Sequence, residues 1–317
     1  MAVLKEPGRF ELERSEDLAD LRPDEVRIDL EGCGVCGSDM AVWNGAPWFE
    51  YPLAPGAPGH EGWGRVAEVG EEVSGFAPGD RVAAMSFNAY ADFDVAKASQ
   101  IVRLPAELND MPYFPGEPLG CAMNVFERSG VEPGMKVAVV GVGFLGLILT
   151  NLYMSAGAEV IAISRRPYAL DLAQDAGAKH AIRLNGDDHA VMEQVSRLTH
   201  EQGCDVALEA TGKAGPLNLA GELPGNRGRL VIAGFHQDGP REIDFQSWNW
   251  RGIDVINAHE RDPERYVSGI RRAVDAIVKG KLRLRDVYTV FPLTQINEAF
   301  RTTEERPDGF IKAVVTT

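Results

Sequence analysis

Residues that could bind a metal ion lie in two short stretches of the chain. Cys33 and Cys36 are three positions apart in a glycine-rich run, and His60 is followed directly by Glu61. Thiolate, imidazole and carboxylate are all ligands that zinc accepts, and three protein ligands with one open position form a catalytic zinc site. Each residue taken singly also has a structural interpretation, since a buried cysteine packs as a small apolar side chain. Together the four residues favour a metal site.

The cysteines limit what kind of site this is. The chain has four, at positions 33, 36, 121 and 204, which is too few for a disulfide scaffold in 317 residues. A Cys-x-x-Cys pair can be a redox pair, half of a zinc knuckle, or one functional thiolate beside a packed neighbour. Because no second close pair exists, the sequence does not predict a four-thiolate zinc site, and reduced thiols are expected.

A second chemical signature follows an apolar run. Val137–Val140 leads into a G-x-G-x-x-G turn and then a helix-compatible segment, and a second predicted strand, Val160–Ile163, completes the unit. The first glycine of such a turn permits the tight bend, the second lets the backbone approach a pyrophosphate, and the third allows helix and strand to pack closely. This context predicts dinucleotide binding. The predicted cofactor-binding residues of the turn are Gly141, Gly143, Phe144, Leu145 and Gly146.

The end of the second predicted strand indicates which dinucleotide is bound. An acidic residue there would bind the ribose 2′-hydroxyl of NAD, whereas this chain has Ser164, Arg165 and Arg166. Guanidinium groups match a 2′-phosphate through charge-assisted hydrogen bonds. The alternative is a solvated helix start, although arginine at a helix N-terminus is disfavoured by the helix dipole. NADP is therefore the predicted cofactor, with NAD possible.

These residues are positioned by two kinds of region. Between Val26 and Val102, short β-rich segments are separated by Gly, Pro and Asp, which predicts an antiparallel β domain. After Pro133, apolar strands alternate with glycine turns and longer helical stretches, which is typical of a doubly wound parallel sheet. The last part of the chain returns to strands and helices and is expected to rejoin the first domain. An α/β fold with these two parts is the prediction.

The sequence resembles the zinc-dependent branch of the medium-chain dehydrogenase/reductase superfamily, which contains alcohol and polyol dehydrogenases. The resemblance depends on the motifs Gly34–Asp39, Gly59–Glu61 and Gly79–Val82 and on the glycine turn, in the family's order and spacing. It implies a GroES-like β catalytic domain and a Rossmann cofactor domain. The implied domains are residues 1–122, 123–258 for the NAD(P)-binding part, and 259–317, which return to the catalytic domain.

The resemblance also implies roles at the metal. Cys36 looks like the zinc thiolate, His60 the imidazole ligand and Glu61 a carboxylate that binds or exchanges at the metal. Glu117 matches a Glu-Pro-Leu motif of sorbitol-dehydrogenase-like members, in which that glutamate contacts zinc directly or through water. Which of the two glutamates binds zinc stays open. Cys33 and Cys204 are assigned structural roles, and Cys121 aligns less well.

Two neighbouring residues resemble the family's proton-handling groups. Asp39 looks like the carboxylate that orients the histidine ligand and fixes its tautomer. Ser38 looks like the hydroxyl that hydrogen-bonds the substrate oxygen and begins proton release. Relatives often continue this relay with a histidine, but here that position is Ala41, so water or the cofactor ribose could take its place. The family's run of four cysteines that binds a structural zinc is missing between Val82 and Tyr90, which predicts one zinc ion per chain.

Residues near the C-terminus complete the expected cofactor site. Ala233 and Phe235 fall where relatives flank the nicotinamide, and Lys312 falls where a basic residue touches the pyrophosphate, although an edge-strand lysine would look the same. His236 and His259 could be substrate contacts or surface histidines.

The expected reaction is the zinc-dependent, NADP-preferring interconversion of an alcohol and its ketone or aldehyde. A polyol, sugar or cyclitol substrate is favoured by the resemblance of Glu117. One alternative is a metal-free NADPH-dependent enone or quinone reductase of the same superfamily. Another is a catalytically inactive NADPH-binding regulatory protein, in which the fold is kept as a sensor.

Composition and charge limit the partners. Acidic residues outnumber basic ones by 47 to 32, which gives a formal charge of −15 and argues against a nucleic-acid partner. The chain has neither an apolar run long enough for a membrane span nor an N-terminal signal pattern, so no membrane partner and a cytoplasmic location are expected. The β-rich stretch Gly252–Ala258 lies where relatives pair two sheets edge to edge, which predicts a homodimer.

Overall fold

The computed structural model describes residues 1–14, 20–283 and 287–317. The chain forms two compact units. Unit 1 contains Met1–Gly120, Asp262–Val278 and Arg285–Thr317, and unit 2 contains Cys121–Arg261 and Lys279–Leu284. The two ends of the chain therefore fold together in unit 1.

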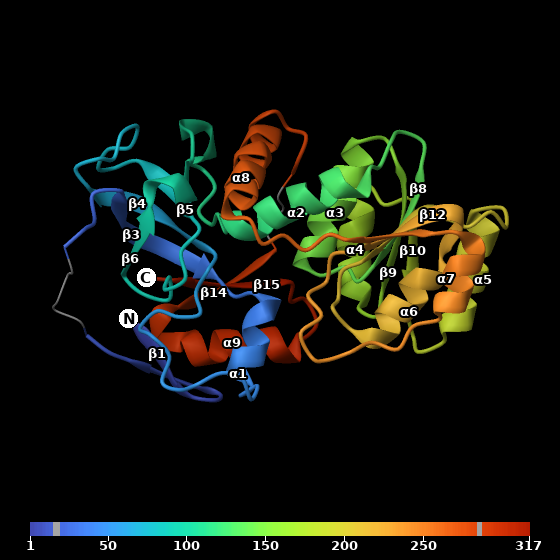
Figure 1. Ribbon diagram of the computed structural model, residues 1–317, viewed down its shortest axis with the longest axis horizontal. Helices are drawn as coiled ribbons and strands as arrows, with labels where there is room; N and C mark the ends of the chain where they lie inside the picture. The colour runs from blue at the N-terminus through green and yellow to red at the C-terminus, as the bar shows by residue number, and fades with distance from the viewer. Residues whose placement is uncertain (15–19, 284–286) are drawn as a thin grey trace. The chain divides into compact units, whose positions relative to one another are not determined.

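Unit 1 is built on a seven-stranded sheet in the order β14-β15-β3-β4-β5-β7, with β6 paired to β3 (Figure 1). The pairs are antiparallel, as the sequence predicts, except that β14 and β15 are parallel. Helix α9 lies between these two strands in the chain and makes the crossover that a parallel pair requires. The strands are β3 (Glu25–Gly34), β4 (Gly62–Val69), β5 (Arg81–Ala84), β6 (Phe93–Lys97), β7 (Ile101–Arg103), β14 (Tyr288–Pro292) and β15 (Lys312–Thr316).

The remaining elements of unit 1 surround this sheet. An antiparallel hairpin, β1 (Ala2–Glu6) with β2 (Arg9–Leu12), begins the chain. The helices are α1 (Met40–Trp43), α8 (Pro263–Val278), α9 (Ile296–Glu305) and the start of α2 (Gly116–Ser129), which continues into unit 2.

An aromatic cluster forms the centre of the core of unit 1. Phe10, Trp43, Tyr90 and Phe300 are each at most 4% exposed, and their ring centroids lie 4.8 to 6.1 Å apart in the contacting pairs. They come from the hairpin, α1, the segment before β6, and α9. Because aromatic rings bury large apolar areas, this cluster joins the two ends of the chain to the loop that carries Tyr90.

Unit 2 is a doubly wound parallel sheet in the order β10-β9-β8-β11-β12-β13. Its strands are β8 (Lys136–Val140), β9 (Glu159–Ser164), β10 (His180–Arg183), β11 (Cys204–Glu209), β12 (Pro224–Ile232) and β13 (Asp254–Asn257). Its helices are α3 (Phe144–Ser155), α4 (Pro167–Asp175), α5 (Asp188–Leu198), α6 (Ala214–Glu222) and α7 (Phe245–Arg251). Figure 1 shows α3 and α4 on one face of this sheet and α5, α6 and α7 on the other.

Burial explains why the central strands are so apolar. Val137–Val140 in β8 is at most 1% exposed and Val160–Ile163 in β9 is fully buried, since helices cover both faces of the sheet. Strands β8 and β11 are neighbours although β9 and β10 lie between them in sequence. The strand order thus reverses at β8, and in open α/β sheets ligands bind at the carboxyl ends of the strands at such a point.

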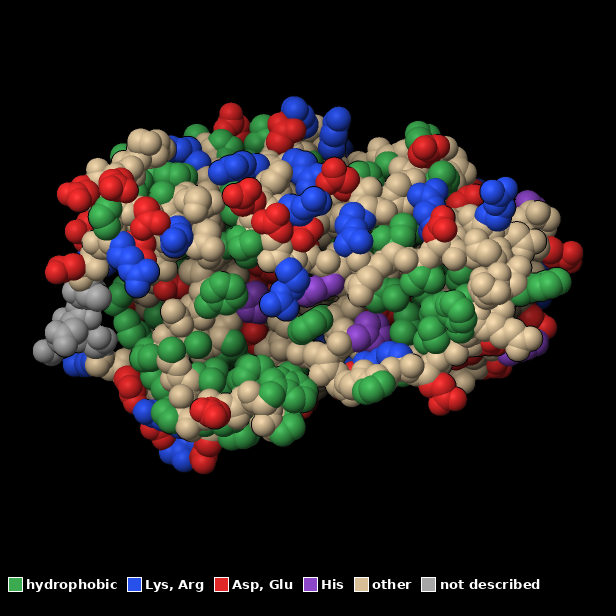
Figure 2. Space-filling view, in the orientation of Figure 1, with side chains coloured by type: hydrophobic (Ala, Val, Ile, Leu, Met, Phe, Trp, Pro, Cys, Tyr) green, Lys and Arg blue, Asp and Glu red, His purple; other side chains and the backbone are tan. Residues whose placement is uncertain are grey.

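The surface agrees with the charge pattern of the sequence. Figure 2 shows acidic and basic side chains interspersed over the displayed face, without a broad basic patch among the described residues on that face. Among the residues that the structure describes, no helix combines the length and the apolar character needed to cross a lipid bilayer.

Candidate active site

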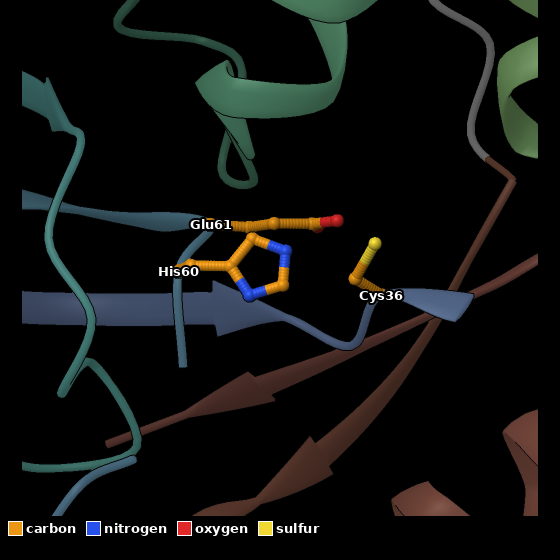
Figure 3. A group of neighbouring side chains, drawn as sticks. All are labelled: Cys36, His60 and Glu61. Atoms are coloured by element: carbon orange, nitrogen blue, oxygen red, sulfur yellow. The ribbon is translucent and has the colours of Figure 1, made fainter. Parts of the chain in front are cut away.

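The structure brings Cys36, His60 and Glu61 together in unit 1. Their potential ligand atoms all lie within 4.8 Å of one another, and Figure 3 shows the three side chains converging. The antiparallel pairing of β3 with β4 explains this, because Cys33 is opposite Gly62. The loop that leaves β3 and the segment that enters β4 therefore lie side by side, and each contributes its polar residues to one point.

His60 is oriented by groups on one side of its ring. Its Nδ1 lies 2.9 Å from the carbonyl oxygen of Pro58 and 3.3 Å from Asp39 Oδ1. Nδ1 therefore donates to these acceptors, and Nε2, on the other side of the ring, is the nitrogen that could bind a metal. Ser38 Oγ lies 3.5 Å from that Nε2. Fixing the tautomer through Nδ1 is how proteins prepare a histidine for metal binding.

Tyr90 supports Asp39 and was not singled out from the sequence. Its hydroxyl lies 2.9 Å from Asp39 Oδ2 and 3.1 Å from the carbonyl oxygen of Gly34, and both are acceptors. Asp39 is 3% exposed and also accepts the backbone N–H of Cys36 at 3.2 Å. The carboxylate thus has partners on both oxygens, and Tyr90 connects the aromatic core to the histidine.

Glu61 pairs with Lys312 from β15. Lys312 Nζ lies 2.7 Å from Oε1 and 2.6 Å from Oε2, and Glu61 is fully buried while Lys312 is 5% exposed. A Cβ at position 34 would overlap Glu61 Oε2, so only glycine fits there. The cofactor contact predicted for Lys312 stays a prediction, and the structure shows its amine bound to this carboxylate.

The charges around His60 and Lys312 favour the protonated, positively charged forms of these two side chains. Burial alone would lower the pKa of His60, but the Asp39 carboxylate and the Cys36 sulfur outweigh it and raise that pKa well above its ordinary value. For Lys312, burial is likewise outweighed by Glu61 and Cys36, and the pKa is raised. The same acidic groups that hold a proton on His60 would attract a metal cation in its place.

The other predicted metal-site residue lies outside this group. Glu117 is 9% exposed in the first turn of α2, and the described residues whose ligand atoms converge are Cys36, His60 and Glu61 without it. Its role at zinc stays a prediction. Cys33 is fully buried, burial raises the pKa of its thiol well above the usual value, and it does not belong to the converging group, so its structural role stays a prediction. Burial also raises the pKa of Cys204, to about 12.

The glycine turn of unit 2 has the geometry that nucleotide binding needs. Gly141 has φ of 100°, and a Cβ there would overlap the Thr211 side chain. A Cβ at Gly146 would overlap the carbonyl oxygen of Gly141, so this glycine permits α3 to pack against the turn. At Gly143 a Cβ would meet no atom within 4 Å. Packing does not require this glycine, which is consistent with a ligand approaching the backbone there.

Ser164, Arg165 and Arg166 lie at the end of β9, as the sequence predicted, but they differ in environment. Ser164 is 8% exposed and its hydroxyl accepts the N–H of Arg166 at 3.3 Å. Arg166 donates from Nη2 to the carbonyl oxygen of Val142 in the glycine turn at 3.4 Å. Arg165 is exposed and forms no hydrogen bond or ion pair with any described residue. Of the two guanidinium groups, Arg165 is the one available to a ligand.

Ala233 and Phe235 follow β12 directly. Phe235 is 47% exposed and its ring stacks on His259 with centroids 5.0 Å apart and planes at 7°. His236 instead turns inward, where both ring nitrogens have partners in unit 2: Glu209 and Arg241. His236 is thus a partly buried residue whose ring is held by hydrogen bonds, and its role as a substrate contact or a surface histidine stays a prediction.

Two dehydrogenase family models match this chain. The alcohol dehydrogenase GroES-like domain model matches residues 22–116, and the zinc-binding dehydrogenase model matches residues 145–275. A 2-dehydro-3-deoxy-L-galactonate 5-dehydrogenase from Pseudoalteromonas atlantica is 26% identical over 92% of this chain and 91% of its own length. A sorbitol dehydrogenase from Halalkalibacterium halodurans is 26% identical, with 88% and 89% covered.

A solved structure shows the same fold. The galactitol-1-phosphate dehydrogenase from Escherichia coli superposes with a TM-score of 0.86 at 21% identity, covering 100% of this chain and 99% of that one. The predicted fold class, a GroES-like β domain with a Rossmann domain, is confirmed.

Proposed function

Because the chain belongs to the zinc-type medium-chain dehydrogenase/reductase family, we propose that it interconverts an alcohol and its ketone or aldehyde with one zinc ion and NADP. The observation that carries this proposal is the convergence of Cys36, His60 and Glu61 within 4.8 Å. A thiol, an imidazole and a carboxylate are a donor set that zinc prefers.

Cys36 and His60, with Glu61 or Glu117, would hold the zinc ion. Bound zinc supplies Lewis acidity, which lowers the pKa of an alcohol or polarises a carbonyl group. His60 would use Nε2, since Nδ1 is occupied by Pro58 and Asp39. Lys312 compensates the charge of Glu61 and so holds this carboxylate in the interior until a cation competes for it.

Ser38 would handle the substrate proton. Its hydroxyl lies 3.5 Å from His60 Nε2, the nitrogen that would bind the metal, so Ser38 would lie close to a substrate oxygen held by that metal. Asp39 does not reach the substrate in this proposal, but keeps His60 in the correct tautomer. Because position 41 is alanine, water or the cofactor ribose would take the place of the relatives' histidine in carrying the proton from Ser38.

The dinucleotide would bind at the glycine turn, which carries Gly141, Gly143 and Gly146, and at the end of β9. The pyrophosphate would lie against the N-terminus of α3, where backbone N–H groups and the helix dipole favour an anion. The exposed Arg165 supports NADP, since its guanidinium has no partner among the described residues and can bind a 2′-phosphate. When bound there, the dinucleotide would supply hydride transfer.

A polyol, sugar or cyclitol is the proposed substrate class. Two relatives carry names of enzymes that act on sorbitol and on a deoxy sugar acid. The Glu117-Pro118-Leu119 motif, which resembles that of sorbitol-dehydrogenase-like proteins, supports the same class.

A homodimer is the proposed assembly. β13 forms one edge of the sheet of unit 2, and Val255 on this strand is 44% exposed. An exposed edge strand can pair with a second copy, which removes its unpaired backbone groups. Val255→Asp should shift the protein toward monomer in light scattering, whereas a wild-type protein that is already monomeric would disprove this assembly.

One set of assays tests the proposed function. A panel of polyols, sugars, cyclitols and simple alcohols with their carbonyl forms is assayed with NADP and NAD, and metal content is measured on the same sample. We expect alcohol oxidation with about one zinc ion per chain. Enone reduction by metal-free protein would favour the reductase alternative, and NADPH binding without zinc or turnover would favour the regulatory one.

A further inference from the structure

A buried carboxylate in unit 2 does not belong to the group of Cys36, His60 and Glu61. Glu209, the last residue of β11, is fully buried. Its Oε1 accepts the backbone N–H groups of Thr211 at 2.6 Å and Gly212 at 2.9 Å, and Oε2 lies 3.0 Å from His236 Nε2. A buried charge needs such donors to offset its desolvation.

The hydrogen bonds of His236 fix its tautomer. The Nε of Arg241 donates to His236 Nδ1 at 2.9 Å, and a guanidinium N–H is always a donor. Nδ1 therefore carries the lone pair, and Nε2–H donates to Glu209. Arg241 Nη2 also donates to the carbonyl oxygen of Gly212 at 3.3 Å. Glu209, His236, Arg241 and Gly212 thus form a closed chain of hydrogen bonds, called here the Glu209 ring.

The Glu209 ring joins two loops at the carboxyl ends of neighbouring strands. Gly212 belongs to the loop after β11, and His236 and Arg241 belong to the loop after β12. The two loops are in close contact, because a Cβ at Gly234 would overlap the backbone nitrogen of Gly212. The second loop also carries Phe235, half-exposed and stacked on His259. The ring therefore fixes the position at which this aromatic pair faces solvent.

The place of the ring in the sheet indicates which ligand it serves. A doubly wound sheet consists of two mononucleotide-binding halves that meet where the strand order reverses. The half with the glycine turn and Arg165 would hold the adenosine and its 2′-phosphate, so the half formed by β11, β12 and β13 would be left for the nicotinamide. The Glu209 ring lies at the carboxyl end of this second half.

We infer that the Glu209 ring is a positioning device for the nicotinamide half of the dinucleotide. His236 and Arg241 hold the loop that bears Phe235 in its binding conformation before the cofactor arrives, which lowers the ordering cost of binding. Neither ring nitrogen of His236 is free, so His236 is a positioning residue rather than an acid or base. The inference depends on the proposed dinucleotide binding.

Calorimetric titration with two ligands tests whether the Glu209 ring positions the nicotinamide half. NADPH contacts both halves of the site, whereas adenosine 2′,5′-bisphosphate contacts only the adenosine half. His236→Ala should weaken NADPH about tenfold, as expected for the loss of two hydrogen bonds, and should change the affinity for the bisphosphate less than about twofold. His236→Gln, whose amide can donate to Glu209 and accept from Arg241, should restore most of the NADPH affinity.

The control is Lys179→Ala, which removes a 58% exposed cation of unit 2 that pairs with Glu159 at 2.6 Å and belongs to neither loop of the ring. It should bind both probes as the wild type does. Arg241→Ala gives the same test if His236→Ala does not fold.

Three outcomes would overturn the inference, and they are distinguishable. Unchanged NADPH affinity in His236→Ala, or equal loss of both probes, would mean that the ring does not serve the nicotinamide half. A wild-type protein that binds neither probe would remove the proposed dinucleotide function itself.

Discussion

The candidate metal site of unit 1 is built from side chains, whereas the glycine turn of unit 2 is built from backbone. The cluster of Cys36, His60 and Glu61 consists of side chains from the loop after β3 and the segment before β4. Two of them have buried polar partners: Asp39 for His60, and Lys312 for Glu61. The glycine turn consists of backbone from six consecutive residues, Gly141–Gly146, and owes its shape to missing side chains.

This difference determines which substitutions damage each site. A site made of side chains depends on distant supporting residues, because removing a partner leaves a buried polar or charged group unsatisfied. A backbone site tolerates changes in exposed side chains, which alter the preference for one ligand over another rather than the site itself. Substitutions at four places in the chain test this contrast, from the largest expected effect to the smallest.

Replacing the predicted zinc thiolate should have the largest effect. Cys36→Ser should abolish most of the bound zinc and lower kcat/KM more than about a hundredfold, since even supporting residues of metal sites contribute 10- to 100-fold. Cys33→Ser, at the buried cysteine three positions earlier, should retain zinc. Metal analysis and kinetics on both variants check this, and equal losses would show that Cys36 is the wrong thiolate.

Removing the partner of Glu61 should destabilise unit 1. Lys312→Met leaves a fully buried carboxylate uncompensated, which costs about 3 to 5 kcal/mol when a buried pair is broken. Zinc would supply the missing positive charge if Glu61 is a ligand. Thermal unfolding with and without zinc should therefore show a larger zinc-induced rise in Tm for the variant than for the wild type. An equal rise would argue that Glu61 does not bind zinc.

The pH dependence of that pair has a definite sign. Because the pKa of Lys312 is raised in the folded protein, the stability from the pair is fully present below the ordinary lysine value. It is lost as the pH rises through the raised value. The wild type should therefore lose its advantage over Lys312→Met in the alkaline range, as measured by Tm.

Changes at the end of β9 should alter cofactor preference and leave the fold intact. Arg165→Ala should weaken NADP about ten- to a hundredfold, since a charge-assisted hydrogen bond contributes about 1.5 to 3 kcal/mol, and leave NAD little changed. Ser164→Asp should shift the preference further toward NAD, because a carboxylate repels the 2′-phosphate. The ratio of kcat/KM for the two cofactors measures this. A wild-type enzyme that prefers NAD would contradict it.

The smallest expected effect is at Tyr90. Tyr90→Phe removes the hydroxyl 2.9 Å from Asp39 Oδ2 and should lower zinc affinity about tenfold, measured by competition with a chelator. Tyr51→Phe is the control, since its hydroxyl donates to the carbonyl oxygen of Val42, outside the Asp39 network. Equal zinc affinities in the two variants would show that Tyr90 contributes only to packing.

Local patterns predicted the elements that carry strong periodic signals. The strand Lys136–Val140 contains the predicted apolar run Val137–Val140, and the helix Phe144–Ser155 begins within the glycine turn, where a helical segment was predicted to follow. The N-terminal hairpin, β1 with β2, and the parallel pairing of β14 with β15 were not foreseen. Short strands at the edge of a sheet carry little pattern of their own, and the residues they contact decide their pairing.

The sequence by itself determined the chemistry available: a thiol, an imidazole and carboxylates at family spacing, and a glycine turn with arginines after the next strand. Only the tertiary structure decided which groups meet. Three hydrogen bonds join residues that are far apart in sequence: Lys312 and Glu61 are 251 positions apart, Tyr90 and Asp39 are 51 apart, and His236 and Glu209 are 27 apart. The physical reason is burial: a charged or polar group removed from water must find a partner in space, and sequence distance places almost no limit on which residue that partner is.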